Sequence, residues 1–181
     1  MTAARAPSGS LAVGGVDLVA LAEDVGTPVF VYDEDHLRAR CKEAVACFGG
    51  GAVAYGTKAF LCKAMAALAV EEGMLLDVST GGELAVALAA GARGSSLVFH
   101  GNNKSVPELK AALAAGVGRI VVDSFDEIQR LAALSGAGLL GSGVYALLRV
   151  TPGVAAHTHE YVMTGQEDSK FGFSLAEGAA D

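Results

Sequence analysis

Residues 52–91, "AVAYGTKAFLCKAMAALAVEEGMLLDVSTGGELAVALAAG", contain two copies of one pattern. Each copy has a short apolar run of β type, then a few polar residues, and then an Ala- and Leu-rich stretch with the spacing of an amphipathic helix. The pattern recurs downstream, so that predicted strands begin near residues 52, 75, 96, 119 and 144. Strands that alternate with helices indicate an α/β fold with a parallel sheet.

The spacing of the predicted strands, about 21 to 25 residues, suits the repeating unit of a (β/α)8 TIM barrel. A complete barrel takes about 250 residues, so five units cannot close one. The sequence therefore predicts either an open five-stranded sheet or an incomplete (β/α)8 barrel. We assign residues 33–181 to this partial barrel and residues 1–32 to a leader and an extension that packs outside it.

The extension is predicted to hold a strand, a short helix capped by Asp17, and a second strand in "TPVFVY" (27–32), before a helix that opens at Asp33–Asp35. Helix starts in the repeat are marked by the S/T-x-x-E pattern of a capping box. The pattern occurs at Thr80/Glu83, Ser105/Glu108, Ser124/Glu127 and Ser174/Glu177. Glycines that fit left-handed helix ends follow at Gly73, Gly91, Gly116 and Gly136.

Composition narrows the function classes. The chain is 52% hydrophobic and 18% charged, as expected of a soluble protein with a real core. Its net charge of −7 gives no basic stripe for nucleic acid, and its apolar runs are shorter than the roughly 20 residues of a membrane span. Residues 1–10 resemble a loose leader rather than a secretory signal. Three cysteines without a C-x-x-C pair suggest free buried thiols, and we expect a cytoplasmic protein.

In parallel α/β folds the chemistry collects at the carboxyl ends of the strands. The polar residues at the predicted ends are Lys58, Asp77 with Ser79 and Thr80, His100 with Asn102 and Asn103, Asp123 with Ser124, and Arg149 with Thr151. We interpret Asp123-Ser124 and Asn103-Lys104-Ser105 as caps and turns. A lysine at a barrel mouth that is partly desolvated could condense with a carbonyl, although position alone favours a surface lysine at 58.

Six blocks of the sequence favour a reactive Lys58 over a surface lysine. The blocks are "TPVFVYDEDHLRARC" (27–41), "AYGTKAFLCKAMA" (54–66), "LLDVSTGGELAVAL" (75–88), "VFHGNNKSVPELKAAL" (98–113), "RIVVDSFDEIQRL" (119–131) and "LLRVTPGVAAHTHEYVMTGQEDSKFGFS" (147–174). In order and spacing they resemble the barrel-fold decarboxylases and alanine racemases that use pyridoxal 5'-phosphate, and most closely the diaminopimelate decarboxylases. The resemblance implies that Lys58, in the Y-x-x-K-A block, forms the Schiff base with the cofactor.

The resemblance also implies cofactor contacts for Asp77 and for Arg149, the latter near the cofactor's phenolic oxygen. His100 points to the same mouth and is included in the cofactor site, although the family's ring-stacking histidine belongs to a later H-S-H block. We favour a capping role for Glu83. In the family, H-S-H and E-P-G-R blocks and a glycine-rich phosphate loop follow later in the sequence. This sequence does not contain them, so we expect an N-terminal fragment that is inactive alone.

The implied function is decarboxylation of a small amino acid, meso-diaminopimelate, to L-lysine and CO2 by a homodimer. Two alternatives stay open: decarboxylation of ornithine or arginine, and a non-catalytic carrier of the cofactor with the same barrel. The extension before the repeat favours the decarboxylases over the carriers. His157, His159 and Glu160 have a spacing that could bind a metal, but with no further histidine nearby we expect none.

Overall fold

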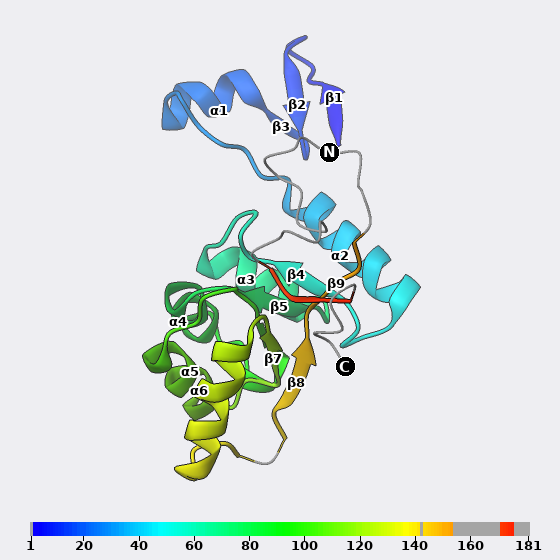
Figure 1. Cartoon of the computed structure of the whole chain (residues 1–181). Coiled ribbons are helices and arrows are strands. Elements are labelled where there is room, and N and C mark those ends of the chain that lie inside the picture. The colour runs from blue at the N-terminus through cyan, green and yellow to red at the C-terminus, as the bar shows by residue number, and fades with distance from the viewer. Residues whose placement is uncertain (1, 142, 154–170, 176–181) are drawn as a thin grey trace.

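A computed structural model describes residues 2–141, 143–153 and 171–175 of the chain. Its centre is a parallel sheet of five strands in the order β4-β5-β6-β7-β8 (Figure 1). The strands are β4 (Ala54–Gly56), β5 (Leu75–Val78), β6 (Leu97–Phe99), β7 (Arg119–Val122) and β8 (Tyr145–Leu148). All five predicted strands of the repeat are therefore present, and each pairs with the next one in sequence.

Four helices connect these strands and pack against one face of the sheet (Figure 1). They are α3 (Lys63–Glu71), α4 (Gly81–Ala89), α5 (Val106–Ala114) and α6 (Phe125–Gly136). The core lies between the two layers, where Leu76, Val78 and Phe99 from the strands are fully buried. Because side chains alternate along a strand, Asp77 leaves the sheet on the face opposite to these helices.

The helix starts predicted at Thr80, Ser105 and Ser124 are correct, but only one of these three capping boxes closes. Ser105 and Glu108 at the start of α5 exchange both hydrogen bonds. Thr80 and Ser124 accept from the backbone N–H of their glutamates, whereas the glutamate carboxylates bond elsewhere. The fourth predicted box, Ser174/Glu177, extends outside the described residues.

The predicted helix ends are correct at three glycines and wrong at the fourth. Gly73, Gly91 and Gly116 have positive φ angles between 69° and 90°, as left-handed helix ends require. Gly136 is instead the last residue of α6, and Gly138, with φ of 73°, has the left-handed conformation. The helix continues because the backbone N–H groups of the following turn still find carbonyl partners on α6.

The N-terminal residues differ from prediction in two places. Residues 3–5 are not a loose leader, because β1 (Ala3–Arg5) pairs with β2 (Leu11–Val13), which pairs with β3 (Val16–Asp17). The helix α1 (Leu18–Val25) is capped by Asp17 as predicted. The run 27–32 is not a strand in the structure, since no described strand pairs with it, and Phe30 there is 89% exposed.

The helix α2 (Glu34–Phe48) begins at Asp33 as predicted and lies between the N-terminal elements and the sheet (Figure 1). Arg38 on α2 binds Glu72 at the end of α3 at 2.8 Å. A short parallel pair, β9 (Val150–Thr151) and β10 (Phe173–Ser174), follows β8. Within the described residues the sheet is open, with β4 and β8 at its edges and all four residues of β8 exposed.

The three cysteines are free, but they are not all buried as predicted: Cys41 is buried, Cys62 is half-buried and Cys47 is exposed. Among the described residues no helix is both long and apolar enough to cross a membrane.

Candidate functional site

The five strands are parallel, so their carboxyl ends all lie along one side of the sheet. This side is called the carboxyl edge, and it is distinct from the edge strands β4 and β8. Lys58 follows β4, His100 follows β6 and Arg149 follows β8. Asp77 is the last residue but one of β5. Strand pairing sets Gly56 opposite Asp77 and Asp77 opposite Val98. The structure therefore places all four residues that the sequence assigned to the site at the same edge.

The loop that carries Lys58 is fixed on both sides. Before it, the buried Thr57 donates its backbone N–H to the Asp77 carbonyl at 3.0 Å. After it, the Tyr55 hydroxyl donates to the Phe60 carbonyl at 2.7 Å, and burial raises the pKa of Tyr55. Lys58 itself is exposed, as its position alone favoured, and β4 is an edge strand in the described sheet.

Glu83 has a different role from the one predicted. Its Oε2 atom accepts from the Ser79 backbone N–H at 2.6 Å and lies 2.9 Å from the Thr57 hydroxyl. The carboxylate thus joins the loop after β5 to the loop after β4 instead of completing a capping box with Thr80. A charged acceptor makes such bonds stronger than neutral ones.

Asp77 and His100 form a pair at the centre of this edge. Asp77 Oδ2 lies 3.3 Å from His100 Nδ1, and each side chain is about one-third exposed. Their other polar atoms, Asp77 Oδ1 and His100 Nε2, are buried and have no hydrogen-bond partner among the described residues. Buried polar atoms are normally paired, so these two atoms point to a ligand that supplies a donor and an acceptor.

Arg149 binds within the chain. Its Nη1 atom lies 3.0 Å from Asp123 Oδ2, and its guanidinium stacks 4.3 Å from the centre of the Phe171 ring. Asp123 Oδ1 also accepts from the Gly172 backbone N–H at 2.8 Å. Arg149 therefore has partners within the chain, and its contact with a cofactor stays a prediction. The interpretation of Asp123-Ser124 as a cap is confirmed at Ser124, which caps α6, while Asp123 binds Arg149 and the Gly172 N–H instead.

Each of these loops is held by a side chain from the following unit. Glu83 on α4 reaches Thr57, and Glu108 on α5 accepts from the Gly81 N–H at 2.8 Å. Glu127 on α6 binds Lys104 at 2.7 Å, and Arg149 binds Asp123. The backbone N–H groups of Ser105 and Gly81 lower the pKa of Glu108. These links join residues 20 or more positions apart, so the S/T-x-x-E pattern gave no signal for them.

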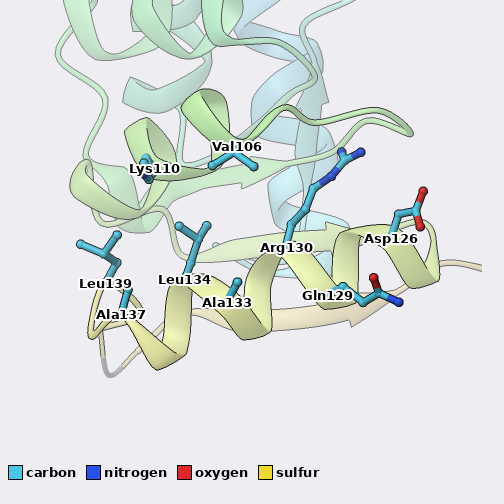
Figure 2. Close-up of a pocket in the computed structure, with 9 residues that line it drawn as sticks. All are labelled: Val106, Lys110, Asp126, Gln129, Arg130, Ala133, Leu134, Ala137 and Leu139. Atoms are coloured by element: carbon cyan, nitrogen blue, oxygen red, sulfur yellow. The ribbon is translucent and has the colours of Figure 1, made fainter.

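His157, His159 and Glu160, where we expect no metal, are outside the described residues. The described part of the chain holds no group of three or more His, Cys, Asp or Glu side chains that could bind a metal. A cavity of about 540 Å³ lies between α5 and α6, lined by residues such as Lys110 and Leu139 (Figure 2). It opens on the outer surface of the helix layer and not at the strand ends.

The arrangement suits one kind of chemistry. A primary amine at Lys58 can form a covalent bond with an aldehyde, and a guanidinium at Arg149 favours an anionic group. Asp77 and His100 between them present an unpaired acceptor and an unpaired ring nitrogen. The edge can therefore hold an anionic carbonyl compound.

Comparisons with known proteins agree with this chemistry. The profile of the family described as "Pyridoxal-dependent decarboxylase, pyridoxal binding domain" matches residues 34–181. Diaminopimelate decarboxylase of Mycobacterium tuberculosis is 55% identical over 174 residues, which cover 95% of this chain and 38% of that protein. The Bacillus subtilis enzyme of the same name is 50% identical over 177 residues, covering 96% and 40%. The chain thus spans about two-fifths of the length of these relatives.

Solved structures show the same fold. The diaminopimelate decarboxylase of M. jannaschii in complex with L-lysine matches with a TM-score of 0.81 and 27% identity, covering 99% of this chain and 42% of that one. This match confirms the predicted partial (β/α)8 barrel, which is not closed in the described residues. The chain therefore belongs to the family of pyridoxal-dependent decarboxylases and carries part of their pyridoxal-binding barrel.

Proposed function

We propose that the protein to which this chain belongs converts meso-diaminopimelate to L-lysine and CO2. The observation that carries the proposal is the 55% identity over 174 residues to a diaminopimelate decarboxylase, in a segment that includes the Lys58 loop. Relatives with this name reach 46% identity or more in five other bacterial species.

The described residues fit pyridoxal phosphate. Lys58 would hold the cofactor through a covalent bond from its Nζ atom to the cofactor's carbonyl carbon. The unpaired atoms of Asp77 and His100 offer polar contacts to a ring, and Arg149 supplies a positive charge at the same edge. When bound, the cofactor withdraws electrons from the bonds of the substrate's α-carbon.

The chain's own residues then have three tasks. Lys58, when its Nζ atom is free, would hold and move a proton beside the reacting carbon of the substrate. Arg149, oriented by Asp123, favours negative charge near the edge of the sheet. Thr57, Tyr55 and Glu83 hold the Lys58 loop in place. The Lys58 amine would therefore stay near the reacting carbon even when it is not bonded to the cofactor.

We also propose that the protein acts as a homodimer in the cytoplasm. The homodimer rests on the resemblance of the blocks to the decarboxylases, and the location rests on the three cysteines, which are free. Light scattering of the full-length protein would test the first, and fractionation of cells that produce it would test the second.

The substrate is tested by measuring CO2 release from meso-diaminopimelate, L-ornithine and L-arginine with saturating pyridoxal phosphate in the full-length protein. We expect turnover with meso-diaminopimelate and formation of L-lysine, detected by chromatography. Faster release of CO2 from ornithine or arginine would overturn the proposed substrate but not the decarboxylase class. Binding of the cofactor without any CO2 release would support a carrier instead.

A further inference from the structure

Lys104 is a buried lysine that the proposed reaction does not use. Its side chain is 0% exposed, and its Nζ atom donates to the Gly101 carbonyl at 2.6 Å and to the Val121 carbonyl at 2.7 Å. The third partner is Glu127 Oε1, also at 2.7 Å. Two carbonyls and a carboxylate thus surround the buried ammonium group, so Lys104 is not available to a cofactor.

Glu127 is buried as deeply and makes a second contact. Its side chain is 4% exposed, and its Oε2 atom accepts from the Asp123 backbone N–H at 2.9 Å. Burying an ion pair removes both charges from water, and the attraction between them often fails to recover this cost. Such a pair is therefore weak evidence for a role in stability alone, and its contacts suggest a second role.

Hydrogen bonds and an ion pair connect this pair to Arg149 in the candidate site. Glu127 holds the backbone of Asp123, whose side chain is 1% exposed and binds Arg149. Lys104 in turn fixes the other oxygen of Glu127 and ties it to the end of β7 through Val121. Arg130 of α6, which Figure 2 shows extending from the helix, donates to the Lys104 carbonyl at 2.7 Å. A continuous series of bonds thus runs from Lys104 through Glu127 and Asp123 to Arg149.

We propose that Lys104 and Glu127 are positioning residues that set the place of the Arg149 guanidinium for the cofactor. The inference rests on the proposed function, in which Arg149 faces pyridoxal phosphate. The pair acts through Asp123 and does not touch the cofactor itself.

The test is a double-mutant cycle in the full-length protein, read as the dissociation constant of pyridoxal phosphate from its absorbance change. Glu127→Gln keeps the size of the side chain but leaves one acceptor oxygen, so either Lys104 or the Asp123 N–H loses its bond. We expect this change to weaken cofactor binding about ten-fold when Arg149 is present. In the Arg149→Met background the same change should alter binding by less than about two-fold, because the group being positioned is gone.

Glu72→Gln is the matched control. Glu72 is also a largely buried glutamate in an ion pair, but its partner is Arg38 on α2, and no described bond joins it to Lys104, Asp123 or Arg149. It should leave cofactor binding within about two-fold of the unaltered protein. Should Glu127→Gln fail to fold, the doubly neutral Lys104→Met, Glu127→Gln variant removes both buried charges and carries the same cycle.

The outcomes separate this inference from the proposed function. An equal loss of binding in both Arg149 backgrounds would mean that the pair acts only through general stability, and would overturn the inference. If Arg149→Met leaves cofactor binding unchanged while Lys58 still attaches the cofactor, the inference fails and the proposed function stands. If Lys58→Ala does not affect attachment, the proposed function fails first.

Discussion

The Glu83 carboxylate lies 2.9 Å from the hydroxyl of Thr57, the residue directly before Lys58. Because Glu83 lies in the first turn of α4, the position of the Lys58 loop depends on a residue 25 places away along the chain. Thr57 also hydrogen-bonds to the carbonyl of Asp77, so the amine and the central carboxylate of the site share one support.

Lys58→Ala should abolish covalent attachment of pyridoxal phosphate and nearly all CO2 release by the full-length protein. The reason is that the alanine has no amine to bond the cofactor. Borohydride reduction followed by peptide mapping measures the attachment. Lys63→Ala is the matched control, since Lys63 is also exposed and lies five residues later. A label on Lys63 or Lys104 in the unaltered protein would show that the assignment of Lys58 is wrong.

Thr57→Val should lower the free energy of unfolding by about 1 to 3 kcal/mol, because it leaves the Asp77 carbonyl and the Glu83 carboxylate with one donor fewer in a buried place. Valine has nearly the same shape, so packing is kept. Urea denaturation of the full-length protein measures the change. An unfolding free energy equal to that of the unaltered protein would mean that the Thr57 hydroxyl does not support the loop.

Cys62 caps α3, with its Sγ atom accepting from the Met65 N–H at 3.5 Å. Serine is a better cap than cysteine, so Cys62→Ser should stabilise the protein by about 0.5 kcal/mol and Cys62→Ala should not. Thermal melts of the two variants make the comparison. Both should keep cofactor attachment and turnover largely intact, and a loss of turnover in both would instead give the thiol a catalytic role.

Asp33 should give the protein an acid-sensitive contribution to stability. Hydrogen bonds from the Thr2 hydroxyl and the His36 N–H lower the pKa of Asp33 from 3.8 to about 2. A lowered folded-state pKa stabilises the fold above the unfolded pKa, and this stabilisation is lost as pH falls from about 4 to about 2. Asp33→Asn keeps the cap but cannot ionise. The difference in unfolding free energy between the two proteins should therefore vanish below about pH 2 and be constant above about pH 5.

The chain of 181 residues alone should expose apolar surface and self-associate. Strand β8 is an unpaired edge in the described sheet, with Tyr145 70% exposed and Leu148 55% exposed. Open edges of this kind pair with other chains. Dye binding to apolar surface and light scattering measure the effect, and Leu148→Lys should reduce it. A monomeric chain with a cooperative melt and decarboxylase activity would contradict this expectation.

The repeat was predictable because its signals are local. The apolar period and the glycines at 73, 91 and 116 each act within one strand or one helix turn, so the five strands and four helices follow from the sequence. Residues 27–32 show the limit of such signals. Their apolar run is typical of a strand, but a strand forms only where a partner is present, and no described strand pairs with this run.

The candidate site was predictable in its members but not in its contacts. The sequence places Lys58, Asp77, His100 and Arg149 at the ends of β4, β5, β6 and β8, and parallel strands bring their ends together. The partner of Arg149 was missed because Asp123 lies 26 residues earlier and reads as a helix cap. Glu108 and Glu127 share one sequence pattern, yet only Glu108 closes its box. What separates them is the buried ammonium of Lys104, which only the fold brings to Glu127.

The links from each unit to the one before it bear on how the barrel could be recombined. Because Glu83 holds Thr57 and Glu127 holds Lys104, a strand with its own helix is not an independent module. A segment exchanged with a relative would keep its loop in place only if it also carried the first turn of the next helix. Crossovers placed just after Glu83, Glu108 or Glu127 should therefore give active hybrids more often than crossovers placed in the loops before them.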